Sequence, residues 1–135
     1  MKTWQEKFET IKTPQIKILD KAFADMPIHC KMLIATPAII DTYVRAIPKG
    51  TRSTFQTMRN DLAITFNAEK TCPVTSGIFL RIVCEVAHAS FLKQHSTRGI
   101  TPFWRIVDLK SPLAKKLSFG TDFIVEQLRK EKIIL

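Results

Sequence analysis

The chain has 135 residues, 45% of them hydrophobic, so it is long enough to bury one core and too short for two comfortable domains. It carries 21 lysines and arginines against 12 acidic residues, and the net charge of +9 favours a polyanionic partner such as nucleic acid. No apolar run approaches the roughly 20 residues of a membrane span and the N-terminus lacks an apolar signal core, so we expect a cytoplasmic protein without a membrane partner.

The first 35 residues are expected to form a helical extension that packs on the main domain. Apolar residues recur at helical spacing over residues 4–11, which predicts an amphipathic helix. A weaker helical pattern covers residues 14–27. The short apolar stretch at residues 29–35 is typical of a strand.

Residues 36–135 are expected to form the main domain. Thr36 as N-cap and Pro37 at the first helical position predict a helix that ends at an I-P-K-G turn. Ser53 followed three residues later by Gln56 resembles a capping box, so a second helix is predicted to begin there.

A long helix is predicted from about Val74 to Lys93, and its two faces differ. The face expected to be buried carries Phe79, Ile82, Val83, Val86 and Ala89. The opposite face begins with a residue that has no side chain and continues to a cation, through Gly77, Arg81, Glu85 and His88. A helix, a short turn and a second helix with small residues at its start is helix-turn-helix geometry, in which the second helix enters a DNA groove.

Residues 100–120 alternate and turn enough to predict a wing-like hairpin or an extended loop. A last helix is expected after Thr121 as its cap, with four residues facing inward, Phe123, Ile124, Leu128 and Ile133. Together these elements predict a fold that is mainly α with a little β, of the winged helix-turn-helix kind.

The three cysteines, Cys30, Cys72 and Cys84, are too widely spaced for a disulfide framework or a zinc site, and buried, unreactive thiols are expected. Cys72 is the exception to follow, because it precedes a predicted helix and a helix N-terminus favours a thiolate. His88 and His95 could share a helix face, but we expect a solvated pair rather than a metal site. Neither a metal nor another cofactor is expected.

Three stretches of the sequence, in this order, carry a resemblance: IPKGTRSTFQTMRNDLA, CPVTSGIFLRIV and TPFWRIV. They are similar to the C-terminal domain of alkylguanine-DNA alkyltransferases and of the alkyltransferase-like proteins. In that family the corresponding pieces read approximately I-P-x-G-x-x-x-[ST]-Y, a glycine-containing recognition helix with an arginine, and P-C-H-R-V. The resemblance covers roughly residue 36 to the end, and it implies a winged-helix domain whose recognition helix enters the minor groove.

The resemblance also implies which residues contact DNA. Thr54 and Phe55 match the polar and aromatic pair that contacts backbone phosphate, although Phe55 lacks the usual phenol hydroxyl. Gly77 and Arg81 match the recognition helix, where small residues allow a close approach to the minor groove. No arginine stands near residue 73, where the family has its base-flipping arginine, so flipping by that mechanism is left open.

The reactive motif departs most from the family. Pro102 and Arg105 match P-C-H-R, but Phe103 and Trp104 stand at the cysteine and histidine positions. Alkyl transfer needs a thiolate activated by a neighbouring base, which neither aromatic supplies. The chain is thus similar to the alkyltransferase-like proteins, which lack the acceptor cysteine, recognise alkylated bases and hand them to other repair proteins. The resemblance implies a non-enzymatic monomer, with Pro102, Phe103 and Trp104 in a lesion pocket.

Two alternatives for these residues stay open. Phe103 and Trp104 could stack on an unpaired base or pack in the core. Arg105 could bind a phosphate or pair with Asp108.

Two clusters of basic residues are expected to flank the recognition helix and face the phosphates of one duplex. The first comprises Arg45, Lys49, Arg52 and Arg59, and the second Lys93, Arg98, Arg105, Lys110, Lys115 and Lys116. The residues predicted to bind double-stranded DNA are Lys49, Arg52, Thr54, Phe55, Gly77, Arg81, Arg105, Lys110, Lys115 and Lys116. Two other functions stay open, a genuine alkyltransferase that uses Cys72 or Cys84 and a protein-interaction or regulatory module on the same fold.

Overall fold

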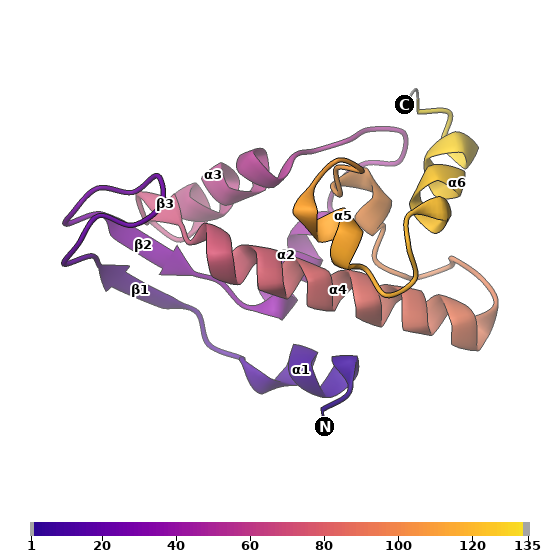
Figure 1. Ribbon diagram of the computed structural model, residues 1–135, viewed down its shortest axis with the longest axis horizontal. Helices are drawn as coiled ribbons and strands as arrows, with labels where there is room; N and C mark the ends of the chain where they lie inside the picture. Colours follow the sequence, from indigo (N-terminus) through magenta and orange to yellow (C-terminus); the bar gives the residue numbers. More distant parts are fainter. Residues whose placement is uncertain (1, 134–135) are drawn as a thin grey trace.

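The computed structural model describes residues 2–133. The protein is mainly helical with a small three-stranded sheet, which confirms the expected class (Figure 1). Its elements in chain order are α1 (Trp4–Thr10), β1 (Gln15–Ile18), β2 (Lys31–Ile34), α2 (Pro37–Arg45), α3 (Phe55–Thr65), β3 (Lys70–Thr71), α4 (Pro73–Gln94), the 3₁₀ turn η1 (Phe103–Arg105), α5 (Pro112–Lys116) and α6 (Asp122–Lys130).

The sheet joins the first 35 residues to the rest of the chain. Strand β2 lies in the middle, antiparallel to β1 and parallel to β3. The backbone N–H of Cys72 donates to the carbonyl of Leu33, and that of Glu69 to the carbonyl of Lys31, both at 2.8 Å. Backbone hydrogen bonds therefore cross the boundary expected at residue 36.

The helix expected over residues 14–27 is wrong, whereas the strand expected at 29–35 is confirmed by β2. In β1, Ile16 and Ile18 recur with a period of two, which suits a strand, and β2 supplies the hydrogen-bonding partner. The backbone N–H of Leu19 donates to the carbonyl of Cys30 at 3.0 Å and extends this hairpin. A short isolated helix is marginal without a face to bury, so pairing with β2 prevails.

The helix α4 runs through the middle of the protein, with α1 on one side and α5 on the other (Figure 1). Phe79, Ile82 and Val83 are buried as expected, but Ala89 is exposed, so that assignment is wrong. Leu80 is buried, although the helical spacing did not place it on the buried face. Because α1, α2, α5 and η1 all contact α4, several directions of packing decide which of its residues are covered.

Helix α4 is long and apolar enough, by length and composition alone, to cross a membrane. This qualifies the expectation that no segment reaches such a length. In the fold, 44% of its most apolar window is buried inside the protein, and buried core helices pass the same test.

Of the two alternatives for residues 100–120, the wing-like hairpin is wrong, and the chain outside η1 and α5 is irregular. Residues 100–120 form η1 and α5 and contain no strand. Ser111 caps α5, since its Oγ accepts a hydrogen bond from the backbone N–H of Ala114 at 3.2 Å, and Pro112 takes the first helical position. These local signals favour a short helix over a hairpin.

The start of α3 also differs from expectation. The N-cap is Thr54 rather than Ser53, and its Oγ1 accepts a hydrogen bond from the backbone N–H of Thr57 at 3.0 Å. The backbone N–H of Ser53 instead donates to the carbonyl of Arg105 at 2.7 Å. The helix therefore begins one residue later, because the chain at Ser53 is held against η1.

Candidate nucleic-acid interface

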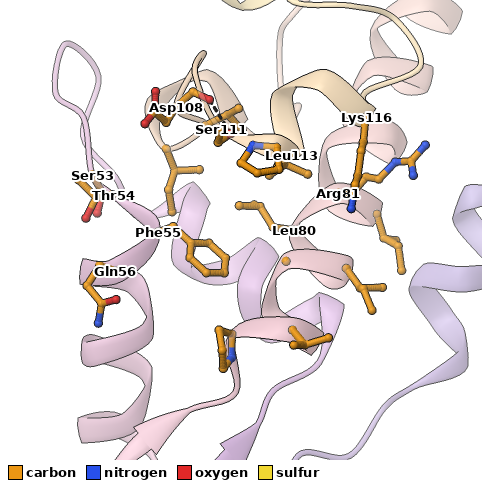
Figure 2. Close-up of a pocket in the computed structure, with 18 of the residues that line it drawn as sticks. Ser53, Thr54, Phe55, Gln56, Leu80, Arg81, Asp108, Ser111, Leu113 and Lys116 are labelled. Carbon is orange, nitrogen blue, oxygen red and sulfur yellow. Dashed lines mark hydrogen bonds between the residues drawn. The ribbon is translucent and has the colours of Figure 1, made fainter. Parts of the chain in front are cut away.

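An open groove lies between the N-terminal ends of α3 and α4 and the segment from Ile106 to Lys116 (Figure 2). Its volume is about 1120 Å³. Six of the ten residues predicted to bind DNA line it, and they come from separate parts of the chain: Arg52, Thr54, Phe55, Gly77, Arg81 and Lys116.

The α3 side of the groove is built on the first residues of that helix. Thr54 is exposed, and its hydroxyl oxygen caps the helix by accepting the hydrogen bond from Thr57. Phe55 follows at the first helical position. In Figure 2 the ring of Phe55 points into the groove toward Leu80 of α4. Arg52 donates a hydrogen bond to the carbonyl of Val107, which ties the loop before α3 to the opposite rim. The geometry of this side is therefore fixed by the fold.

The α4 side presents four residues at helical spacing, Val74, Gly77, Ile78 and Arg81. Val74 and Ile78 are 53% and 54% exposed, which is unusual for apolar residues on a central helix. A Cβ added to Gly77 would meet no other atom within 4 Å. Glycine inside a helix costs about 1 kcal/mol relative to alanine, so neither packing nor backbone geometry explains Gly77.

Arg81 lies beside the carboxylate of Glu85, which already accepts two hydrogen bonds from Ser118. Its Nε is 3.6 Å from Oε2 of Glu85, and this nitrogen has no hydrogen-bond partner. Glu85 was assigned to the polar face, but it is buried and accepts hydrogen bonds from the backbone N–H of Ser118, at 2.8 Å, and from its hydroxyl. That assignment was wrong because the turn after α5 covers this part of α4. The side chain of Arg81 remains 34% exposed.

Helix α1 adds two residues to the groove that sequence analysis missed, Trp4 and Lys7. The guanidinium carbon of Arg81 lies 5.0 Å from the Trp4 ring centroid, and Nζ of Lys7 lies 4.3 Å from the centroid. Both cations are placed for attraction by the aromatic ring. The amphipathic pattern predicts the helix, but no signal in the sequence says that it lies against α4.

Three other predicted DNA-binding residues lie outside this groove. Lys110 and Lys115 are exposed in the segment that carries α5, without lining the groove. Lys49 is exposed and lines a second, smaller cavity.

Arg105 has a structural role, and the expected pairing with Asp108 is wrong because its partner is Glu131. Its Nη2 lies 2.9 Å from Oε2 of Glu131, and its Nη1 donates to the carbonyl of Ile47 at 2.8 Å. The two ionised side chains are 13% and 7% exposed. Burial alone would raise the pKa of Glu131, but hydrogen bonds from Arg105, the Gly50 backbone and Trp104 outweigh it and hold the pKa below its usual range. The guanidinium is therefore engaged in an internal ion pair, and Arg105 also lines the second, smaller cavity.

Phe103 does not line a lesion pocket, which corrects the expectation for this residue. It is 0% exposed and packs in an aromatic cluster, with its ring stacked at 5.6 Å on that of Phe123 and edge-on at 5.6 Å to that of Phe119. Trp104 is 4% exposed and donates its indole N–H to Glu131 at 2.6 Å. The core-packing alternative is thus correct for Phe103, whereas Trp104 is buried but still lines a cavity.

Pro102 and Trp104 nevertheless contribute to the second cavity, of about 490 Å³, between the end of α2, η1 and α6. Lys49, Arg45 and Lys130 also line it, so its rim is rich in cations. Of the predicted pocket residues, only Phe103 has no place in either cavity.

Arg59 belongs to the expected first basic cluster but does not face outward. It is buried, donates from Nε to the carbonyl of Thr71 at 2.8 Å, and pairs with Asp25 at 2.9 Å. The hydrogen bond from Arg59 lowers the pKa of Asp25 to about 2. This arginine holds α3 against β3 and against the segment between β1 and β2 that carries Asp25.

The cysteines are free and buried in this structure, as the sequence predicts. Burial raises the pKa of the Cys84 thiol, and Cys72 is the N-cap of α4 but makes no hydrogen bond there with its side chain. Cys72 is 4% exposed and Cys84 is 0% exposed.

The two helical histidines do not form a solvated pair. His88 stacks on Phe119 at 3.9 Å, and burial lowers its pKa. His95 ends α4 in a left-handed conformation and is exposed. Among residues 2–133, no group of three potential metal ligands comes together.

The protein is mainly α-helical. Its main groove is bordered by cations and by exposed apolar side chains. No family model, curated protein or solved structure matches the chain.

Proposed function

We propose that the protein is a non-enzymatic, alkyltransferase-like DNA-binding protein that holds duplex DNA in the groove between α3 and α4 and recognises alkylated guanine. The observation that carries this proposal is the convergence of six predicted DNA-binding residues on one open groove, five from two separate motifs and Lys116 from the second basic cluster. The cations Lys7, Arg52, Arg81 and Lys116 border it, and the net charge of +9 adds long-range attraction to phosphate.

In this proposal α3 and α4 form the helix-turn-helix, and the segment from Ile106 to Lys116 takes the position of the wing. Gly77 lets the backbone of α4 approach the floor of the minor groove. Val74 and Ile78 flank it with exposed apolar side chains, of the kind that minor-groove proteins insert between base steps. They offer an apolar alternative to the base-flipping arginine that this sequence lacks.

The smaller cavity beside η1 is the proposed place for the alkylated base. Pro102 and Trp104 give it an apolar wall, and Lys49 lies at its rim. The loop over residues 48–53 contributes Lys49 to this cavity and Arg52 to the main groove.

The absence of enzymatic activity is part of the proposal. An acceptor for an alkyl group must be an accessible, activated thiolate. Cys72 and Cys84, the only candidates in the main domain, are 4% and 0% exposed. Trp104 stands where the family has its base, and its N–H is already bonded to Glu131.

A binding titration tests the proposal. Fluorescently labelled duplexes, one plain and one carrying a methylated guanine, are titrated with the protein at two salt concentrations. We expect affinity to fall steeply with salt, because each neutralised phosphate releases counterions, and to be higher for the methylated duplex. Undetectable binding at low salt would refute DNA binding, and equal affinities would reduce the function to non-specific binding. Intact-mass analysis after incubation would reveal a transferred methyl group and refute the non-enzymatic assignment.

A further inference from the structure

The N-terminal hairpin, residues 11–31, exposes more apolar surface than its own fold explains. Five of the nine large hydrophobic side chains that are exposed in the described part of the chain lie within it. They are Ile11, Ile16, Ile18, Phe23 and Ile28, between 40% and 63% exposed. Scattered exposed apolar residues are normal, but a group on one short hairpin is typical of an interaction surface.

The hairpin also has a free strand edge. Strand β1 is paired only with β2 and forms one edge of the sheet (Figure 1), and all four of its residues are exposed. The backbone N–H of Leu19 points inward to Cys30. Because inward and outward groups alternate along an antiparallel strand, the backbone N–H and C=O groups of Ile16 and Ile18 point outward. An unpaired edge of this kind is a template for another strand.

The charges beside this edge are positive and uncompensated. Lys12, Lys17 and Lys21 are exposed, and none of them lies within ion-pair distance of a carboxylate in the described residues. Of the two acids in the hairpin, Asp25 is already paired with Arg59 and only Asp20 is left. A second copy of the chain would bring like charges together. Binding of DNA would not account for the exposed isoleucines beside the free strand edge. The complementary partner is acidic and apolar.

We propose that the outer edge of β1 binds an extended segment of a partner protein in which acidic and apolar residues alternate. The segment adds a strand to the sheet through the outward groups of Ile16 and Ile18. Its apolar side chains cover the isoleucines, and its carboxylates meet the three lysines. This site goes beyond DNA binding and uses none of the residues that line the main groove.

A defined peptide probe tests this site on the full chain. The probe is a short synthetic peptide that alternates valine with glutamate, and the controls alternate valine with lysine or serine with glutamate. Hydrogen exchange followed by NMR should show slower exchange at the amides of Ile16 and Ile18 on adding the acidic probe. The amide of Lys17, which faces β2, should not change. Both control peptides should bind at least about tenfold more weakly.

Two variants separate the strand edge from the charge. Ile18→Pro removes an outward N–H without removing a hydrogen bond to β2, and it should weaken binding of the acidic probe about tenfold or more. Ile64→Ser, at an exposed isoleucine on α3, is the matched control and should leave binding unchanged. The double variant Lys17→Glu and Lys21→Glu should lose the acidic probe and gain the valine–lysine peptide. This reversal remains informative even if Ile18→Pro fails to fold.

The proposal is overturned if the acidic probe does not bind, or if it protects amides outside β1. Concentration-dependent self-association that protects Ile16 and Ile18 without peptide would assign the edge to a second copy instead. Protection of the same amides by duplex DNA would assign it to nucleic acid. Duplex titration of Ile18→Pro keeps the two functions apart, because its DNA affinity should equal that of the unmodified chain.

Discussion

The indole N–H of Trp104 donates to a carboxylate oxygen of Glu131 at 2.6 Å, which joins η1 to the residue that ends α6. The same carboxylate pairs with Arg105 and accepts a hydrogen bond from the backbone of Gly50 at 2.9 Å. Three parts of the chain that are distant in sequence therefore meet at one buried anion. Trp104, Arg105 and Glu131 thus form a structural junction between η1, α6 and the turn before α3.

Removing the charge of Glu131 should destabilise the fold strongly. Glu131→Gln leaves Arg105 buried without its counter-ion, and breaking a buried pair in this way costs about 3–5 kcal/mol. Urea unfolding followed by circular dichroism measures the change. Glu126→Gln, at an exposed acid on the same helix, should change stability by less than about 0.5 kcal/mol. Equal midpoints for the two variants would contradict the role given to the junction.

The same junction predicts how stability depends on pH. Because the pKa of Glu131 is lowered in the folded state, its contribution is fully present above the unfolded pKa and is lost as pH falls through the folded one. Stability should therefore decline in the acid range, below about pH 4. Asp25, whose pKa is lowered to about 2 by Arg59, should add a loss of the same sign as the pH falls toward 2. Unfolding midpoints across this range should fall less steeply in Glu131→Gln.

Gly77 offers a test that separates binding from stability. Gly77→Ala should stabilise the protein by up to about 1 kcal/mol, because alanine is the better helix former and its Cβ meets open space. If α4 approaches DNA closely at this point, the added methyl should weaken duplex binding about tenfold. Anisotropy titration and thermal unfolding give the two readouts. Ser90→Ala, at an exposed position near the other end of α4, should leave binding unchanged, and unchanged binding in Gly77→Ala would remove α4 from the interface.

Charge removal at the groove should change the salt dependence of DNA binding. Arg81→Gln and Lys116→Gln should each weaken binding to plain and methylated duplex alike, and should each reduce the salt slope by about one unit. Lys21→Gln, at an exposed lysine between β1 and β2 and outside the groove, is the matched control. Slopes that fall equally in all three variants would point to a diffuse charge effect rather than to contacts in the groove.

The N-cap of α3 gives a prediction about local structure. Thr54→Ala removes the hydrogen bond to the first turn and should cost about 1 kcal/mol, whereas Ser53→Ala should cost much less. Denaturant unfolding distinguishes them. The opposite ranking would restore Ser53 as the cap.

Local signals in the sequence predicted much of the fold. Thr36 and Pro37 start α2 as expected, because a cap and a first-turn proline act over a few residues. The strand β2 and the extent of α4 were also predicted. The candidate site was predicted in part: five of its residues come from two of the motifs and Lys116 comes from a basic cluster, and all six lie around one groove.

What the sequence alone determined are properties that depend on neighbouring residues: helix starts, the length of α4, the positive charge and the order of the motifs. What only the tertiary structure decided is which of these residues face water. Phe103 is sealed in the core, Arg105 is paired with Glu131, Trp4 reaches the groove from α1, and residues 15–18 form a strand. The physical reason is that burial and pairing depend on elements far away in the chain. Glu131 neutralises Arg105 and β2 pairs with β1, and no short-range pattern reports either contact.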